Sequence, residues 1–370
     1  MDGLSTHNEF FAVRLLELAR YIAPRGNRVK FVETCEEERI RSFLEGFPEV
    51  WQRITDNPPR EGIRPSLEFV AERSAYALQA AAFQELIVSR LEAAGIRCLW
   101  LNGLSLSLLL HRDIAARDFE GLQLLVSPGE LAKVRSVLAD LDFEESDGKL
   151  SPGQELACER WGYRRRFRHN TSGFEVVLQW RLFSHWIGSE LQPFEELWSR
   201  SQILQWEGLS RWSTLGMADT LLYVGLSAFE HGWGRLQIML DLVLALERLE
   251  FTYDEALELA GPRRVVLERA VELVVWLMGV PHPQQMTYHY GDYDRALDEW
   301  ADLLSEKRPL QEELVAPELW SCNPSQALAL RLSALLTPEL RDIRAVALPP
   351  SLIFLYPAIR ALRFILPGSS

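Results

Sequence analysis

The chain has few cysteines, and none of them is paired in the sequence. The four are scattered over 370 residues without a C-x-x-C pair or the spacing of a zinc site, which indicates reduced, structural thiols. They are Cys35, Cys98, Cys158 and Cys322. The histidines add no H-x-x-x-H or cysteine-linked pattern, so no zinc site is expected. A phosphate-binding loop and a G-x-S-x-G motif are also missing, which leaves kinase-type and hydrolase-type chemistry without support.

An overall excess of positive charge is missing too. The formal net charge is −13, whereas contact with phosphates requires clustered Lys and Arg. General nucleic-acid binding is therefore excluded. The local exception is a basic stretch that could hold a phosphate, or could form a solvated strand face. It consists of Arg160, Arg164, Arg165, Arg166, Arg168 and His169.

No apolar run is long enough to predict a membrane span. The most apolar tract, Ala345 to Leu366, contains three prolines and two arginines, which are costly in hydrocarbon. A short amphipathic helix at 358–366 could rest on a membrane surface or pack on the protein's own core. Met1 to His7 lacks a basic-then-apolar signal, so a cytoplasmic location is expected.

The composition is that of a folded protein with more than one domain. Hydrophobic residues make up 48% of the chain and charged residues 25%, and 370 residues exceed one ordinary core. A loop rich in proline, glycine and asparagine at 56–65 is the first boundary. We predict an N-terminal helical layer (1–60), an α/β domain (61–212) and a helical domain (213–370).

Periodicity predicts an α+β fold. A helix at 67–94 with Gly95 as its left-handed cap is followed by strand 96–101, helix 104–111, strand 122–126 and helix 128–141. Alternating runs at 161–168 and 174–182 flank a turn and predict a hairpin. Later segments predict only helices, at 217–229, 236–249, 253–260, 262–277, 296–304 and 324–336. The expected architecture is a small mixed sheet flanked by helices, with N-terminal helices and a mostly helical C-terminal region.

Several of these segments resemble one family in their order and spacing. Leu99-Trp-Leu-Asn-Gly-Leu, then Arg117 and Gly121-Leu-Gln-Leu-Leu-Val, is similar to L-K-G-x-a-L, Arg and D-I-D-L-L-V of the bacterial nucleotidyltransferase-like family, which has the polymerase-β-type fold. Val176-Val-Leu-Gln-Trp-Arg-Leu looks like its I-D-L-H-W-R-L strand. His231-Gly-Trp-Gly-Arg-Leu and Asp241 look like its H-x-W-x-R-L and following Asp. The resemblance covers roughly 67–249, and more loosely 352–357.

The resemblance implies a site for two metal ions held by three carboxylates. Two of them alternate on one strand, where side chains at i and i+2 share a face, and the third is on a neighbouring strand. This chain has Gly121, Gln123 and Val177 at those positions, Asn102 in place of the Lys and Gln179 in place of the strand His. Glycine and valine side chains cannot bind Mg²⁺, and a glutamine offers only a neutral oxygen. We therefore expect a degenerate relative without a cofactor, acting as a scaffold or as a binder of a nucleotide, peptide or protein.

A shifted set of carboxylates is the alternative. Asp118 and Glu120 repeat the alternating pattern three residues earlier, and Glu175 lies two residues before Val177. An odd shift points side chains to the opposite face of a strand unless a bulge intervenes, and charged loop residues are commonly just solvated. With this set the chain would be an active nucleotidyltransferase that uses Mg²⁺ and transfers a nucleoside monophosphate to a small-molecule or protein hydroxyl.

The same resemblance marks a set of ligand-binding candidates. His231 and Arg235 stand one helical turn apart and could both face a cleft, or Arg235 could pair with Asp241 across a domain contact. The full set is Asn102, Gly103, Ser105, Arg117, Gln123, Gln179, His231 and Arg235.

Overall fold

The computed structural model describes residues 67–117, 119–188, 192–230, 236–248, 250, 253–278 and 324–365. The predicted N-terminal helical layer and the helix predicted at 296–304 lie outside these residues. Three of the candidate site residues do as well: Asp118, His231 and Arg235.

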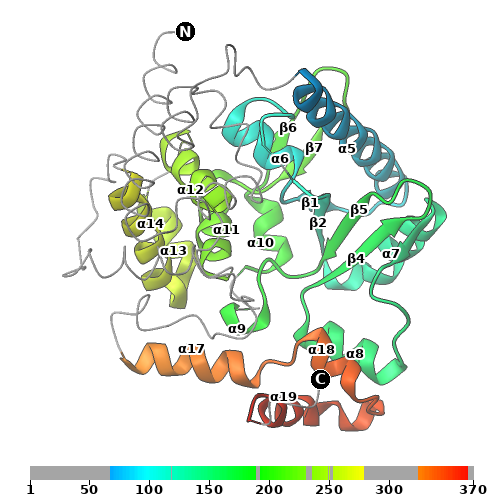
Figure 1. Cartoon of the computed structure of the whole chain (residues 1–370), viewed down its shortest axis with the longest axis vertical. Coiled ribbons are helices and arrows are strands. Elements are labelled where there is room, and N and C mark those ends of the chain that lie inside the picture. The colour runs from blue at the N-terminus through cyan, green and yellow to red at the C-terminus, as the bar shows by residue number, and fades with distance from the viewer. Residues whose placement is uncertain are drawn as a thin grey trace.

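A seven-stranded mixed sheet forms the centre of the fold, in the order β3-β4-β5-β2-β1-β7-β6 (Figure 1). The β2–β5 and β1–β7 pairs are parallel and the other neighbours are antiparallel. The strands are β1 (Cys98–Trp100), β2 (Leu122–Val126), β3 (Phe143–Glu145), β4 (Arg164–His169), β5 (Glu175–Gln179), β6 (Gln202–Leu204) and β7 (Trp212–Thr214). This sheet, flanked by helices, confirms the predicted fold class.

One face of the sheet packs against α5 (Leu67–Ala93) and α7 (Leu131–Asp140). Alternation along β2 sends Leu122, Leu124 and Val126 into this core and turns Gln123 and Leu125 to the other face. Gly95 caps the turn after α5 with a φ of 68°, as predicted.

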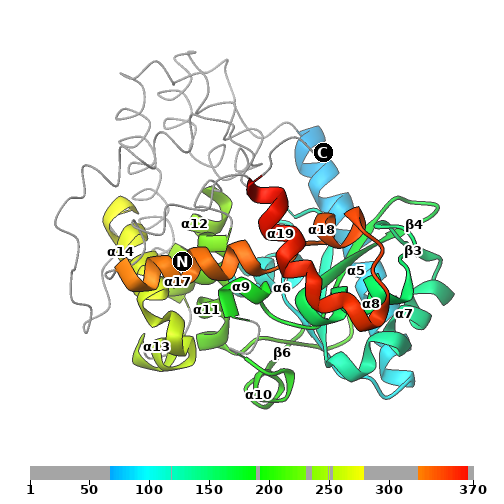
Figure 2. The same ribbon diagram turned by 90° about the horizontal axis from the view of Figure 1, so that it is seen from below.

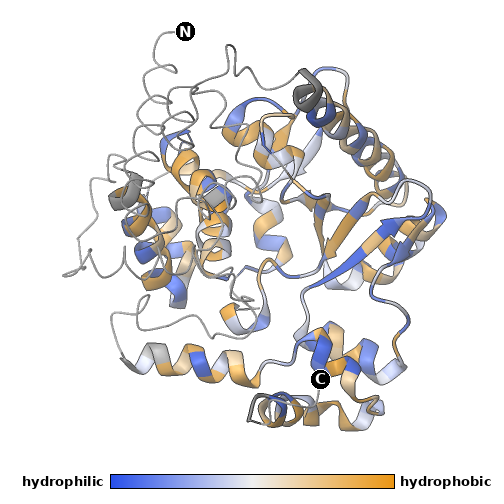
Figure 3. Cartoon of the chain, in the orientation of Figure 1, coloured by the Kyte–Doolittle hydropathy of each residue, from blue (hydrophilic) through white to orange (hydrophobic). Residues whose placement is uncertain are grey.

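The other face looks toward a helical bundle. Its helices are α11 (Met217–Glu230), α12 (Leu236–Arg248), α13 (Tyr253–Ala260) and α14 (Arg264–Met278), and they share one core with Leu99, Leu101 and Leu125 of the sheet region. Figure 3 shows α11 as hydrophobic along most of its length, as expected of a helix buried among its neighbours. Short helices α9 (His185–Gly188) and α10 (Phe194–Ser199) and the 3-10 turn η4 (Gly261–Arg263) complete this part.

The C-terminal elements return to the α/β part of the chain. They are α17 (Pro324–Leu336), α18 (Leu340–Ala345), η5 (Pro350–Leu355) and α19 (Tyr356–Ile365). Figure 2 shows α17 and α19 along one side of the molecule. Buried Tyr356 packs edge-on against Trp161, joining this segment to α8 (Pro152–Trp161) in a third, small core. None of the described helices combines the length and apolar character needed to cross a bilayer.

The structure corrects several predicted bounds. The strand predicted at 161–168 begins at Arg164, because Trp161 is the last residue of α8, a helix that starts with a Ser151/Gln154 capping box. The predicted 104–111 helix is α6 (Leu104–Leu106) continued by a π-helical turn, η2 (Ser107–His111). The 128–141 helix begins with a 3-10 turn, η3 (Pro128–Glu130). Strands β3, β6 and β7 were not predicted, because three residues are too few to show a period.

Candidate functional site

A cleft of about 350 Å³ opens between the sheet and the helices α11 and α12. Its sheet side is formed by the cleft-facing residues of β2, β5 and β4, and its helix side by polar residues of α11 and α12. The predicted residues among its lining are Asn102, Arg117, Glu120, Gly121, Gln123, Glu175, Val177 and Gln179. Segments far apart in the sequence thus converge on one polar cleft.

The three positions that the resemblance assigns to metal carboxylates lie together on the floor of this cleft. Gln123 is directly opposite Val177 in the parallel β2–β5 pair. Gly121 precedes β2 with a φ of 140°, a backbone conformation that side chains rarely allow. A Cβ atom at Gly121 would lie 2.4 Å from the carbonyl oxygen of Glu175. The backbone of β5 therefore occupies the space that a side chain at residue 121 would need.

Gln123 is already engaged by a residue of the helical bundle. The hydroxyl of Tyr223, on α11, donates a 2.9 Å hydrogen bond to Oε1 of Gln123. Burial raises the pKa of Tyr223 to about 12, so its hydroxyl stays protonated and keeps donating at neutral pH. This bond links the sheet to the bundle across the cleft.

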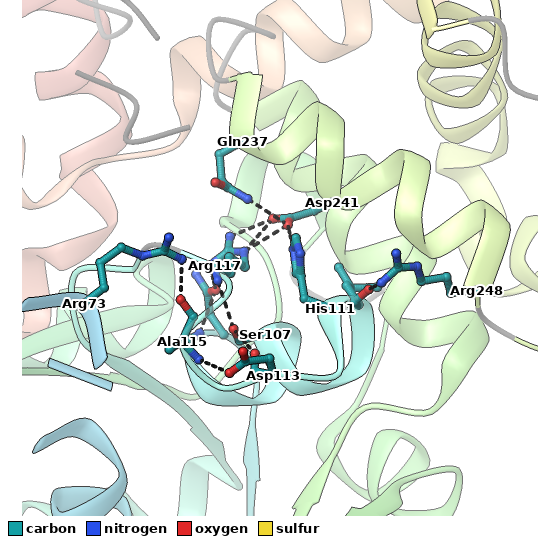
Figure 4. A network of polar contacts seen from close by, with 12 residues as sticks. Arg73, Ser107, His111, Asp113, Ala115, Arg117, Gln237, Asp241 and Arg248 are labelled. Atoms are coloured by element: carbon teal, nitrogen blue, oxygen red, sulfur yellow. Dashed lines mark hydrogen bonds and ion pairs between the residues drawn. The ribbon is translucent and has the colours of Figure 1, made fainter. Parts of the chain in front are cut away.

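A buried ion pair makes a second link. Nε and Nη2 of Arg117 donate to the carboxylate of Asp241, on α12, at distances of 2.7–2.9 Å (Figure 4). Nη1 of Arg117 donates to Oδ1 of Asn102 at 2.8 Å. Gln237 donates to the same carboxylate at 3.2 Å, and Nε2 of His111 is 3.9 Å from it. Although burial alone would raise it, the pKa of Asp241 is held below its ordinary value by Arg117 and His111.

Hydrogen bonds from η2 and α5 hold the loop that carries Arg117. The hydroxyl of Ser107, in η2, accepts from the backbone N–H of Arg117 at 3.2 Å and donates to the carbonyl of Asp113 at 2.8 Å. The Asp113 carboxylate accepts from the N–H of Ala115, whose carbonyl accepts from Arg73 of α5 (Figure 4). These bonds set the guanidinium of Arg117 against α12.

The basic stretch divides between the two faces of β4. Arg165 is turned away from the cleft, is only 1% exposed, and pairs with Glu145 at 2.6 Å and Glu155 at 3.2 Å. Arg164 and Arg166 line the cleft. The solvated-face reading therefore holds for part of this strand, because Arg166 and Arg168 are exposed and Arg164 is half-buried, whereas Arg165 is buried in an ion-pair cluster.

Next to Arg164 lies a paired tyrosine and glutamate. Burial and a side-chain hydrogen bond to Glu230, at the end of α11, raise the pKa of Tyr163 well above its ordinary value. The guanidinium of Arg164 lies 4.9 Å from the centre of the Tyr163 ring. Burial acts against its charge, but Tyr163 and Glu230 raise the pKa of Arg164 above its usual range. Arg164 therefore stays charged inside the cleft.

Gln179 is a buried polar residue of the cleft with an unsatisfied acceptor in the part of the chain that the structure describes. The side chain is 2% exposed, and its Oε1 atom has no hydrogen-bond partner within the structure. A buried amide without a partner costs free energy, so such groups are few in folded proteins and call for an explanation.

The remaining predicted residues are placed as follows. Glu120 is exposed and Glu175 half-buried, both at the cleft, whereas Asp118 lies outside the described residues. Within the described part of the chain, no group of three His, Cys, Asp or Glu side chains could hold a metal ion. Gly103 and Ser105 do not line the cleft, and the Ser105 hydroxyl accepts a 3.0 Å bond from the Trp212 indole N–H.

Sequence reasoning missed most of the helix side of the cleft. Tyr223, Ser227, Glu230 and Gln237 line it, and Tyr163 lines the sheet side next to β4, yet none belongs to a recognisable motif. Asp241 was singled out as a possible partner for Arg235, which lies outside the described residues; the sequence did not indicate the ion pair that Asp241 forms with Arg117. A polar residue within an apolar helix, such as Asp241 in α12, was the one available signal.

Comparison with known proteins gives one match. The family model described as uncharacterised nucleotidyltransferase matches residues 50–280. No curated protein and no solved structure matches the chain. The matched segment includes the whole sheet and the helices that line the cleft, and it spans more than half of the 370 residues. The chain belongs to the uncharacterised nucleotidyltransferase family.

Proposed function

We propose that this protein is a catalytically degenerate nucleotidyltransferase-like protein whose cleft binds a ligand without transferring a nucleotidyl group. The observation that carries the proposal is the geometry at Gly121. Its Cβ position is 2.4 Å from the Glu175 carbonyl oxygen, so a carboxylate cannot stand there unless the backbone moves. Loss of the first carboxylate is therefore built into the backbone as well as into the side chain.

The other two positions support the same proposal. Mg²⁺ prefers charged oxygen ligands, but Val177 has no polar side-chain atom and the Gln123 oxygen accepts from Tyr223. The residues present do not fit a divalent cation at this point. The most buried carboxylate among the described lining residues, Asp241, is neutralised by Arg117. The ligand of this proposal is a nucleotide, a peptide or a segment of a partner protein.

The proposal is tested by measuring transfer and binding separately. Purified protein is incubated with each of the four NTPs and Mg²⁺ or Mn²⁺, and pyrophosphate release is followed. We expect release no faster than with a Tyr223→Ala/Gln123→Ala variant, which opens the cleft. Binding is followed by calorimetry with the same nucleotides in EDTA. Pyrophosphate release that depends on metal and on intact Gln123 contradicts the proposal.

A second candidate function is active nucleotidyl transfer with shifted carboxylates. One observation favours it: two of the shifted carboxylates line the same cleft. They are Glu120, which lies just before β2, and Glu175, which is the first residue of β5. The transfer would break the bond between the α-phosphorus and the bridging oxygen of an NTP, join the phosphorus to an acceptor hydroxyl and release pyrophosphate. Release that disappears in Asp118→Asn, Glu120→Gln and Glu175→Gln, but persists in the surface control Glu144→Gln, would establish it.

A further inference from the structure

The cleft face of the β4–β5 hairpin carries cationic and neutral side chains opposite one another. In the antiparallel register Arg164 pairs with Gln179, Arg166 with Val177 and Arg168 with Glu175. Residues two apart on a strand share a face, so the arginines form one row and their partners another. Arg164 and Arg166 line the cleft, whereas Arg168 lies outside it, and the carboxylate of Glu230 acts on Arg164.

Arg166 is an exposed arginine that lines the cleft. It faces the cleft, and among the described residues no carboxylate forms an ion pair with it. Val177 stands directly opposite, at the position where the resemblance places a carboxylate. A carboxylate at 177 would neutralise Arg166 across the strands, whereas valine leaves its positive charge facing the cavity. The substitution thus changes the sign of this part of the cleft.

The neighbouring Arg164–Gln179 pair adds a second, independent sign of a ligand. Oε1 of Gln179 is buried and has no hydrogen-bond partner among the described residues, and Gln179 lines the cleft opposite Arg164. An acceptor in this state is satisfied by a hydroxyl or amine that a ligand brings. Arg164 keeps its charge beside the carboxylate of Glu230, which itself accepts a hydrogen bond from the Tyr163 hydroxyl.

We infer that Arg164, Arg166 and Gln179 form a subsite for an oxyanion that carries a hydroxyl or amine beside it, bound without a divalent cation. The two arginines donate charge-assisted hydrogen bonds to the oxyanion, and Gln179 accepts from the adjacent donor. The acidic residue of β5, Glu175, begins the strand four residues before Gln179, roughly 13 Å away at the usual rise of a strand. This inference rests on the proposed binding function and specifies its ligand.

The first experiment titrates simple oxyanions into the full chain in EDTA at constant ionic strength. The probes are inorganic phosphate and malonate, and the readouts are calorimetry and thermal unfolding. We expect one or both to bind and raise the unfolding temperature, the stronger one identifying a phosphoryl or a carboxylate group. Arg166→Gln and Arg164→Gln each should weaken binding at least tenfold. Arg168→Gln is the matched control, because its guanidinium lies beside Gly173 at the hairpin turn and outside the cleft.

The second experiment examines Gln179. Glycerol 3-phosphate supplies the hydroxyl that inorganic phosphate lacks beside its oxyanion, so we expect the wild type to prefer it and Gln179→Met to lose the preference. Three outcomes would overturn the subsite. Neither phosphate nor malonate binds, binding requires Mg²⁺, or Arg166→Gln and Arg168→Gln weaken anion binding equally. Metal-dependent pyrophosphate release would instead overturn the proposed function, so the two failures are distinguishable.

Discussion

Arg117 and Asp241 are separated by 124 positions in the sequence, yet their side chains form a bidentate, buried ion pair. The pair joins the loop before β2 to α12, and so ties the sheet to the helical bundle at the edge of the cleft. A charge buried in this way destabilises the fold if its partner is removed, because the remaining ion cannot be solvated.

The first prediction concerns this pair. Arg117→Met and Asp241→Leu should each lower the free energy of unfolding by about 3–5 kcal/mol, whereas the double variant should recover most of the loss. The reason is that each single variant leaves one buried charge and the double variant leaves none. Urea unfolding of the four proteins measures the coupling. Additive losses in the double variant would show that the two side chains do not stabilise each other.

The second prediction concerns the loss of stability at acidic pH. The pKa of Asp241 is lowered in the folded state, so its contribution is complete above the unfolded pKa of about 3.9 and is lost as pH falls through the folded value. The stability difference between the wild type and Asp241→Asn should therefore shrink below about pH 4. Asp219 and Glu145 have raised pKa values in the folded state, chiefly from burial. Their contributions to the free energy of unfolding therefore increase as pH falls. Both carboxyl groups are present in the wild type and in Asp241→Asn, so their contributions cancel in the stability difference between these two proteins. A difference that is constant from pH 6 to pH 3 would contradict the assignment.

The third prediction concerns Gly121. Gly121→Ala should lower the free energy of unfolding by about 3 kcal/mol, because the new Cβ meets the Glu175 carbonyl and the φ of 140° strains any side chain. Gly129→Ala is the control, since a Cβ there meets nothing within 4 Å. Restoring the carboxylates with Gly121→Asp, Gln123→Asp and Val177→Asp together should not create metal-dependent pyrophosphate release. Equal stability of the two alanine variants would remove the steric argument.

The fourth prediction compares two glutamines of the same cleft. Gln179→Met should raise the free energy of unfolding by about 1 kcal/mol, because it removes a buried acceptor that has no partner. Gln123→Met should instead lower it by about 1 kcal/mol, because Tyr223 loses its acceptor. Denaturant unfolding in the absence of any added anion decides between these signs. Destabilisation by Gln179→Met would mean that the amide is satisfied in solution.

Several features of the fold could be predicted from local pattern. The period of two in Leu122 to Val126 predicts a strand with Gln123 on the face opposite Leu122, and Gly95 after a long apolar helix predicts its left-handed cap. The start of β4 was misplaced by three residues, because the tryptophan at 161 suits a strand as well as a helix end. The same alternation predicts that Arg165 turns away from Arg164 and Arg166, but local pattern could not reveal which carboxylates it meets there.

By itself the sequence determined which side chains alternate on each strand and which residue types stand at the positions of the family's carboxylates. Those are properties of neighbours along the chain, and backbone geometry converts them directly into faces. Only the tertiary structure decided that Asp241 is the partner of Arg117, that the Glu175 carbonyl fills the space beside Gly121, and that Gln179 is left without a donor. These outcomes depend on the distance between segments far apart in the chain, which is set by packing of the sheet against the bundle and has no local signature.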